Sequence, residues 1–227
     1  MKKILLVSCL LSFSIKIFAQ QFSQYNTGTL YDSFENPSQK SFITDSSKRY
    51  ASNFLIPNFN ANFFFSGDAQ NTLKARALFN VYDNANLKIS QGKYNHFGGS
   101  ANFYLFMFKA FRSFNGDTEM GFGWQIKAEG RGLVSDESIA LLNGTQAFAN
   151  DNYSDIFNDN YYYQTYHQFS FSYREKVNKH FAFGVKLSAL LGIEYKNLTI
   201  NHSYIAFNKI SDTASVILQG KYTNSYI

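Results

Sequence analysis

Residues 119–131 read EMGFGWQIKAEGR, and this stretch decides the fold class because its polarity reverses at almost every residue. The apolar positions are Met120, Phe122, Trp124, Ile126 and Ala128. The polar positions between them are Glu119, Gln125, Lys127, Glu129 and Arg131. Successive side chains of a β-strand point to opposite faces. The stretch therefore predicts a long strand with one apolar and one polar face.

The same two-residue period returns along much of the chain. Clear segments lie near residues 52–66, 94–108, 163–173 and 181–195, and weaker ones near 198–207 and 214–226. The strong segments are about 10 to 15 residues long, whereas a tilted transmembrane strand needs about 9–11 and strands of soluble proteins have about 5–6. Residues 52–227 are therefore predicted to form an all-β, antiparallel transmembrane β-barrel.

The connections between these segments alternate in length. Residues 67–93 and 135–162 are long, whereas residues 109–118 and 175–179 are short. Outer-membrane barrels have short periplasmic turns and longer external loops, so we expect the two long connections to lie outside the cell. Within the second long connection, Asp136 is expected to be the N-cap of a short helix that ends at Gly144.

The N-terminus is read as an export signal followed by an arm. Residues 1–19 begin with a charged region, Lys2 and Lys3, and continue as a mostly apolar stretch that Lys16 interrupts and that ends at Ala19, which predicts a cleaved signal peptide. Residues 20–51 are polar and follow no regular period, so we expect an arm or plug that precedes the strands. Cys9 is the only cysteine, and the mature chain would therefore have neither a disulfide nor a thiolate metal site.

The composition excludes several classes of protein. The chain is 19% aromatic and 16% charged with a mean hydropathy of −0.26, and no apolar run after the N-terminus approaches the roughly 20 residues of a transmembrane helix. Three of the 21 basic residues lie in the leader, which leaves 18 against 16 acidic residues, or +2. That balance gives no reason to expect a nucleic-acid partner.

Seven polar side chains are candidates for the interior of the barrel. They are Gln125, Lys127, Glu129, Arg131, Arg174, Lys186 and Glu194. In an open barrel such residues line a pore and set its selectivity. In a narrow barrel they fill the lumen as a salt-bridge network, because buried charges need partners. Both signs are present, which favours the network.

No arrangement of residues predicts catalysis. The four histidines lie on different segments without the spacing of metal ligands, and no nucleophile can be paired with an oriented base. Asp151, Asp155 and Asp159 recur every four residues, but they lack the pattern of a calcium loop and are read as solvated. We therefore expect no enzyme activity, no cofactor and no metal.

Three stretches resemble an uncharacterised outer-membrane β-barrel family of Bacteroidota-type bacteria. They are residues 25–37 (YNTGTLYDSFENP), residues 128–140 (AEGRGLVSDESIA) and residues 183–187 (FGVKL). Asn36-Pro37 is also similar to a dipeptide of fatty-acid-transporter-like and gliding- or secretion-associated barrels. The resemblance implies an outer-membrane barrel without an assigned activity. Family members look longer, so we expect this chain to be an N-terminal part of a larger barrel.

The predicted function is that of a non-enzymatic outer-membrane barrel protein with a structural or transport-related role. Its expected partners are outer-membrane lipid and other envelope proteins. Two alternatives stay open: a barrel component of a protein-secretion or gliding apparatus, and a soluble secreted β-sandwich.

Overall fold

The structure is a computed structural model that describes residues 29–41, 48–54, 56–81, 84–112, 116–208, 210–211 and 213–226. The predicted signal peptide and residues 20–28 and 42–47 of the predicted arm lie outside the described residues. None of the helices in the described part of the chain combines the length and the apolar character needed to cross a membrane.

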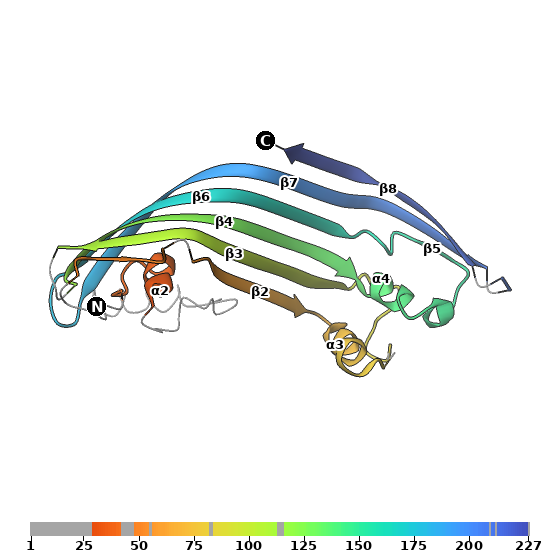
Figure 1. Ribbon diagram of the computed structural model, residues 1–227. Helices are drawn as coiled ribbons and strands as arrows, with labels where there is room; N and C mark the ends of the chain where they lie inside the picture. The colour runs from red at the N-terminus through yellow and green to blue at the C-terminus, as the bar shows by residue number, and fades with distance from the viewer. Residues whose placement is uncertain are drawn as a thin grey trace, which may run out of the picture. The chain divides into compact units, whose positions relative to one another are not determined.

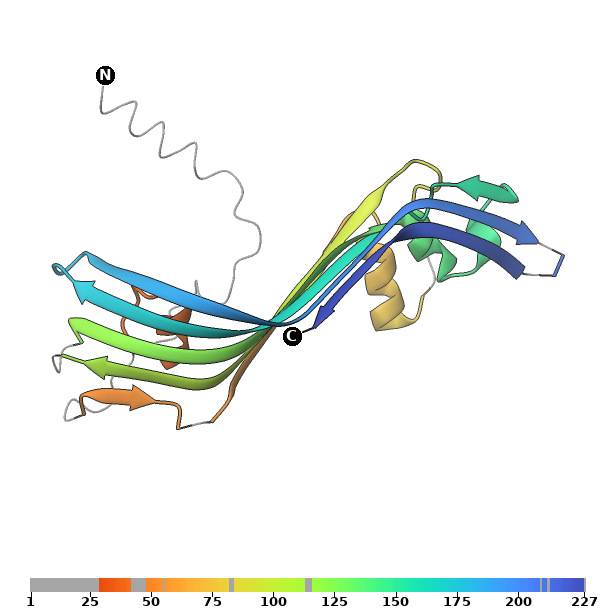
Figure 2. The ribbon, with the colours of Figure 1, turned by 90° about the horizontal axis from the view of Figure 1, so that it is seen from above.

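In the described part of the chain, eight strands form one sheet (Figure 1). They are β1 (Tyr50–Ser52), β2 (Asn58–Ser66), β3 (Tyr94–Phe111), β4 (Thr118–Ser135), β5 (Asn152–Ser154), β6 (Asn160–Lys176), β7 (Ala182–Asn208) and β8 (Thr213–Tyr226). The strand order is β1-β3-β4-β6-β7-β5, and in addition β2 pairs with β3 and β8 pairs with β7. Figure 2 shows the long strands β3, β4, β6 and β7 side by side from a second direction. The predicted all-β antiparallel class is confirmed.

The sheet is open in the described part of the chain. β1 and β2 pair only with β3 at one edge, and β8 pairs only with β7 at the other. No described strand joins the two edges, so the described strands do not close into the expected barrel.

The chain divides into two compact units, and the four longest strands contribute to both. Unit 1 comprises Met1–Phe54, Met107–Phe122 and Phe171–Leu187, and it contains helix α2 (Leu30–Glu35). Unit 2 comprises Leu55–Phe106, Gly123–Ser170 and Ser188–Ile227. It contains helices α3 (Gln70–Phe79) and α4 (Asp136–Leu141) and the short 3₁₀ helix η2 (Thr145–Ala147).

The buried residues of unit 1 are unusually polar. Lys109, Glu119, Ser172 and Arg174 are all buried there, together with Met107 and Phe111. Several large apolar side chains of β4, β6 and β7 in this unit are instead exposed, and they include Met120, Phe122, Phe171, Phe183, Val185 and Leu187. Unit 1 thus buries its polar face and exposes its apolar face.

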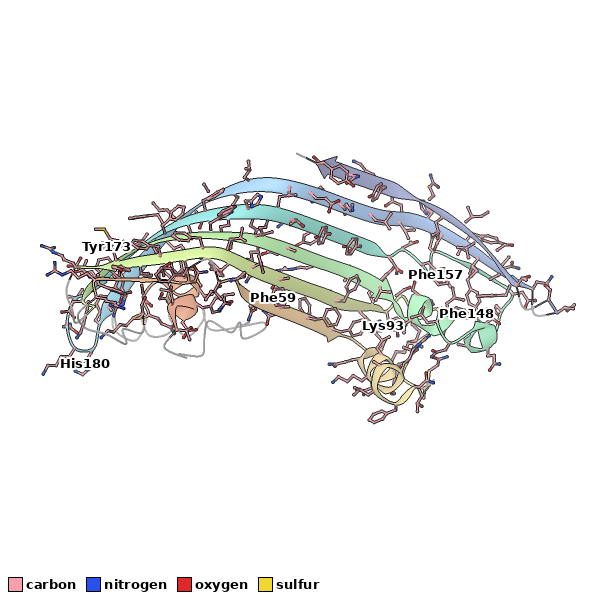
Figure 3. All side chains as sticks on the ribbon, in the orientation of Figure 1. Phe59, Lys93, Phe148, Phe157, Tyr173 and His180 are labelled. Carbon is pink, nitrogen blue, oxygen red and sulfur yellow. The ribbon has the colours of Figure 1, made fainter. Side chains whose placement is uncertain are left out.

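Unit 2 has an apolar core at the connection between β4 and β6. It contains Ala140, Phe148, Tyr153, Phe157, Ile205 and Phe207. Phe148 lies at its centre, with its ring centroid 4.7 Å from that of Phe207 and 6.5 Å from that of Phe157 (Figure 3). This core anchors the long connection to the end of β7.

Strand β7 changes its buried face along its length. In unit 1 the odd-numbered Phe183, Val185 and Leu187 are exposed. In unit 2 the odd-numbered Ser203, Ile205 and Phe207 are buried. The pairing with β8 shifts between Ile200 and His202, so that Asn201 has no partner in the register. Side chains of a strand alternate with a period of two, so after one extra residue the odd-numbered side chains lie on the opposite face of the sheet.

Four local expectations need correction. Residues 67–93 were expected to be a loop but contain α3, and residues 29–36 contain the capped helix α2. Residues 181–207 were expected to form two strands but form the single strand β7. The expected helix after residue 135 is present as α4, but Ser135 caps it rather than Asp136.

Candidate functional site

Unit 1 contains a buried ion cluster on three neighbouring strands. Glu119 of β4 lies between Lys109 of β3 and Arg174 of β6. Its carboxylate is 3.5 Å from Lys109 Nζ and 3.4 Å from Arg174 Nη1, and the three side chains are 0%, 1% and 6% exposed, respectively. Because buried charges are costly without partners, a single carboxylate supports two cations here.

Helix α2 packs onto this cluster through its C-terminal end. The last carbonyl groups of a helix have no partners within the helix, and α2 has no basic residue of its own in its last turn. Lys109 Nζ donates to the Ser33 carbonyl at 3.4 Å, and Lys186 Nζ donates to the Phe34 carbonyl at 2.8 Å. Cations at a helix C-terminus are also favoured by the helix dipole. The strands therefore cap α2 from outside.

The start of α2 is fixed by its own sequence. Thr29 is the N-cap, and it forms a capping box with Asp32 in which each side chain accepts the other residue's backbone N–H at 3.4 Å. Such a cap satisfies donors that the first turn leaves without partners. A helix of only six residues is thus held at both ends, by local residues at its start and by strand lysines at its end.

The chain after α2 is held by the same ion cluster. Arg174 Nε donates to the Ser38 carbonyl at 2.9 Å. Ser41 Oγ donates to Glu119 Oε2 at 2.9 Å, and the Ser41 backbone N–H points to the same carboxylate. We call residues 29–41 the N-terminal segment, and Lys109, Glu119, Arg174 and Lys186 its charged seat.

Two glycines make room for this arrangement. A Cβ on Gly184 would lie 2.2 Å from the carbonyl carbon and oxygen of Pro37, so only glycine allows the segment this close to β7. A Cβ on Gly121 would lie 2.6 Å from Ser172 Oγ and 3.0 Å from Lys109 Cε. The Lys109 side chain therefore crosses β4 at Gly121, which has no side chain of its own.

The seven predicted interior residues fall into separate groups. Arg174 and Lys186 belong to the charged seat in unit 1. In unit 2, Gln125 is 2% exposed and donates to Gln168 at 2.7 Å. The remaining four are also in unit 2: the pair Lys127 and Glu129 at 2.7 Å, Glu194 paired with Lys196 at 2.6 Å, and Arg131, which is exposed. Four of the six predicted charges are thus in ion pairs, and the pairs Lys127–Glu129 and Glu194–Lys196 each lie within one strand.

Sequence reasoning missed Lys109 as a site residue. The alternation near the end of β3 breaks at Phe106 and Phe108, and the sequence therefore predicts that the connection begins at Lys109. In the structure β3 continues to Phe111, and Lys109 is buried. A signal was available: a single lysine in the apolar run FMFKAF (residues 106–111) needs a buried partner if the run is a strand. Glu119 was placed on the polar face but not singled out.

A second polar group lies in unit 2 around α4. Asp136 accepts the Lys88 N–H at 2.9 Å, and Glu137 accepts the Ser90 N–H at 2.6 Å, so α4 is bound to the connection before β3. Asp159 accepts the Ser135 N–H at 2.8 Å. Burial raises the pKa of Glu137, and the nearby carboxylates Asp136 and Asp159 raise it further.

The spaced aspartates do not form a cation site. Asp155 accepts the Ser203 N–H and pairs with His202 at 3.2 Å, whereas Asp159 binds the start of α4. Across the described residues, no group of three or more His, Cys, Asp or Glu side chains is placed to hold a metal ion.

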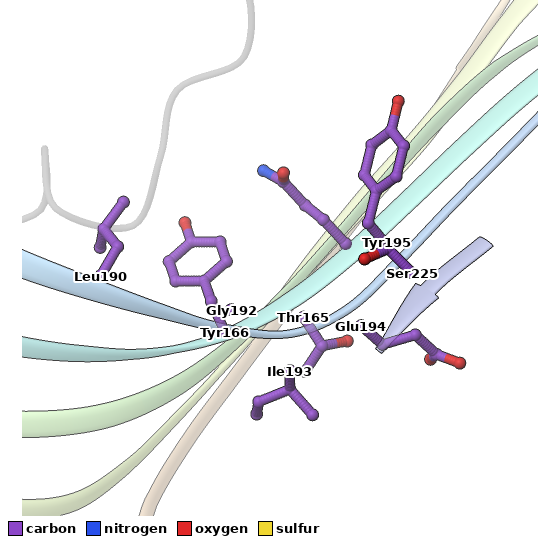
Figure 4. Close-up of a pocket in the computed structure, with 9 residues that line it drawn as sticks. Thr165, Tyr166, Leu190, Gly192, Ile193, Glu194, Tyr195 and Ser225 are labelled. Carbon is purple, nitrogen blue, oxygen red and sulfur yellow. The ribbon is translucent and has the colours of Figure 1, made fainter. Parts of the chain in front are cut away.

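A shallow pocket of about 270 Å³ lies on unit 2 where β8 ends (Figure 4). Its lining comes from β6, β7 and the end of β8, namely Gln164, Thr165, Tyr166, Leu190, Gly192, Ile193, Glu194, Tyr195 and Ser225. Glu194 is its only acidic residue and it has no basic residue, so it offers no pair of groups for catalysis.

The fold and the seat define an antiparallel β-sheet protein that buries charge and binds its own N-terminal segment. Residues 42–226 match the model of a family of unknown function, DUF5723, and the chain belongs to this family. No curated protein and no solved structure matches the chain.

Proposed function

We propose that the chain contributes strands to an outer-membrane β-barrel whose role is structural or transport-related and not enzymatic. The observation that carries the proposal is the reversed burial of unit 1. Glu119 is 0% exposed, whereas Met120 beside it on β4 is 50% exposed. In water the large apolar side chains would be the ones removed from solvent. A strand between lipid and a polar interior has the opposite preference.

The apolar exposure continues along several strands. Phe59 and Phe63 of β2, Phe171 of β6, and Leu187 and Leu191 of β7 are each at least half exposed. Monomeric soluble proteins rarely expose apolar patches of this extent. The same pattern argues against the soluble β-sandwich, because a sandwich would bury these side chains between its two sheets.

Strand length supports the same proposal. β3 and β4 each have 18 residues and β6 has 17, whereas a tilted strand crosses a bilayer with about 9–11. The proposal requires further strands, because open edges are not tolerated in hydrocarbon. It therefore includes the expectation that this chain is an N-terminal part of a larger barrel.

Within that barrel the N-terminal segment acts as a plug. It contributes buried side chains such as Tyr31 and Phe34 and accepts hydrogen bonds from Lys109, Arg174 and Lys186. These contacts come from β3, β6 and β7, so the segment spans the width of the polar face in unit 1. A plug held by several strands obstructs the interior at this level.

Neighbouring residues on β7 test the membrane proposal. Leu187 and Ser188 are both exposed, but they lie on opposite faces of the strand. An arginine on the lipid face near the bilayer midplane costs about 2–4 kcal/mol, so Leu187→Arg should strongly lower the amount of protein in the outer-membrane fraction. Ser188→Arg, the matched control, should leave that amount nearly unchanged. Equal recovery of the two variants from a soluble fraction would contradict the proposal.

A further inference from the structure

We propose that the charged seat is an oxyanion-binding site that the N-terminal segment covers, and that a phosphate- or carboxylate-type anion replaces the segment when it withdraws. This rests on the proposed plug role only in that the segment must be able to leave its seat. The donors that would bind the anion are those of Lys109, Arg174 and Lys186 that now bind the segment.

The seat carries an excess of positive charge. Lys109, Arg174 and Lys186 face a single carboxylate, that of Glu119, which gives a balance of +2. The strands of unit 1, residues 107–122 and 171–187, hold six basic and three acidic residues. The segment itself has two acidic residues and one lysine, so its charge of −1 is complementary to the strands.

The cations already bind oxygen atoms in the way that they would bind an anion. The partners of Lys109, Lys186 and Arg174 in the segment are the carbonyls of Ser33, Phe34 and Ser38, at 3.4, 2.8 and 2.9 Å. These acceptors are neutral. An ionised oxyanion accepts stronger, charge-assisted hydrogen bonds from the same donors, and arginine binds such groups through two parallel bonds. The segment's carbonyls are therefore weaker ligands in positions suited to anionic oxygens.

An unused donor lies in the same place. Ser172 is 1% exposed, and its hydroxyl has no hydrogen-bond partner among the described residues. It lies with the Lys109 side chain over the missing Cβ of Gly121. A buried hydroxyl without a partner is costly, and it is available to donate to an anion in the seat.

The first experiment uses the full chain with Cys9→Ser, folded in detergent, and inorganic phosphate as the probe. Gly184→Val should push Pro37 away and release the segment, which is monitored by maleimide labelling of a Ser33→Cys variant, since position 33 is buried when the segment is seated. Equilibrium dialysis should show phosphate binding to the Gly184→Val protein about tenfold tighter than to the parent protein, since Lys109, Arg174 and Lys186 no longer donate to the carbonyls of the segment.

Two further substitutions in the Gly184→Val background locate the bound phosphate. Arg174→Gln should weaken binding about tenfold, the loss expected for a hydrogen bond to a charged group. Lys176→Gln is the matched control, because Lys176 is exposed and pairs with Asp117 outside the seat. The proposal is wrong if phosphate does not bind although Ser33→Cys labels rapidly, or if both substitutions have the same effect.

A second measurement applies even if Gly184→Val does not fold. With glycine retained at position 184, phosphate should raise the labelling rate of Ser33→Cys above the rate in sodium chloride of equal ionic strength. An unchanged rate contradicts the anion site. Both measurements are made in detergent solution, so they fail or succeed independently of the Leu187→Arg test of membrane location.

Discussion

Glu119 is the residue on which the buried charges of unit 1 depend, and its removal should be costly. Glu119→Gln keeps the size of the side chain but leaves Lys109 and Arg174 without an anion. Removing one partner of a buried ion pair costs about 3–5 kcal/mol. Urea unfolding of the detergent-folded chain, followed by the fluorescence of Trp124, the only tryptophan, should show a loss of this size.

The control for Glu119 is an exposed pair in the same unit. Asp117 and Lys176 are 3.7 Å apart, and each side chain is 42% exposed. Exposed pairs contribute about 0–1 kcal/mol, so Asp117→Asn should have a small effect. Similar losses for the two variants would mean that the buried cluster does not stabilise unit 1 as described.

Glu137 should make the stability of unit 2 depend on pH. Burial raises the pKa of Glu137 in the folded protein, so folding favours the protonated form. The stability that this group contributes is full below the pKa of a glutamate in the unfolded chain and is lost as the pH rises through the higher folded value. Glu137→Gln should therefore flatten this part of the profile and raise stability at neutral pH, because the amide oxygen of the new side chain can still accept the Ser90 N–H.

The measurement is the unfolding midpoint of both proteins between about pH 4 and pH 8, the range in which a glutamate with a raised pKa titrates. Asp155, whose pKa is lowered by the Ser203 N–H, contributes the opposite slope, but it is present in both proteins and cancels in the difference. A steeper profile for the Glu137→Gln variant would contradict the assignment.

At the residue scale, sequence alone could place side chains on a face but not find their partners. The alternation put Arg174 and Lys186 inward. Their contacts with the segment join residues 136 and 152 positions apart along the chain, and no local pattern carries that information. Lys109 was missed for a local reason, because the alternation fails just before it.

At the scale of elements, strands were predicted better than helices. A long amphipathic strand repeats its signal many times, whereas α2 has six residues, too few for a helical period to show. Its capping box, Thr29 with Asp32, differs from the usual pattern with Glu or Gln at the third position. In α3 the apolar residues Leu73, Leu78 and Phe79 form no continuous stripe, and Leu78 and Phe79 are exposed.

The seat of the N-terminal segment can be tested at one strand glycine. Gly184→Ala places a methyl group against Pro37 and should release the segment, which makes residues 29–41 accessible to limited proteolysis. Gly130→Ala is the matched control, since its Cβ would have no neighbour closer than 3.5 Å. Protection of the segment in both variants would show that the contact with Gly184 does not hold it.

For the whole molecule, the sequence predicted the all-β class because the two-residue period is a local signal. Pairing between strands joins residues far apart in the sequence. The two-residue period therefore could not show that the described strands do not close into a barrel. Chain topology likewise stays a prediction: the connections at residues 67–93 and 135–162 outside the cell, and those at 109–118 and 175–179 in the periplasm.

Cysteine labelling on whole cells tests this topology. The only native cysteine, Cys9, lies in the predicted signal peptide. Asn150→Cys should react on intact cells with a maleimide that cannot cross the outer membrane, and Lys179→Cys should react only after the cells are opened. Both positions are exposed. Lys179 is preferred to Asn178, whose side chain accepts the N–H groups of His180 and Phe181. The reverse labelling would invert the orientation.

Asn201 acts on β7 as a one-base insertion acts on a reading frame. It has no partner in β8, and the parity of the buried positions differs on its two sides. An insertion or deletion in β7 therefore leaves the same side chains buried only if it adds or removes an even number of residues on one side of Asn201. Deleting Asn201 alone would restore an uninterrupted pairing with β8 but would turn Ile205 and Phe207 away from Phe148. The core of unit 2 thus depends on the one extra residue that β7 has relative to β8.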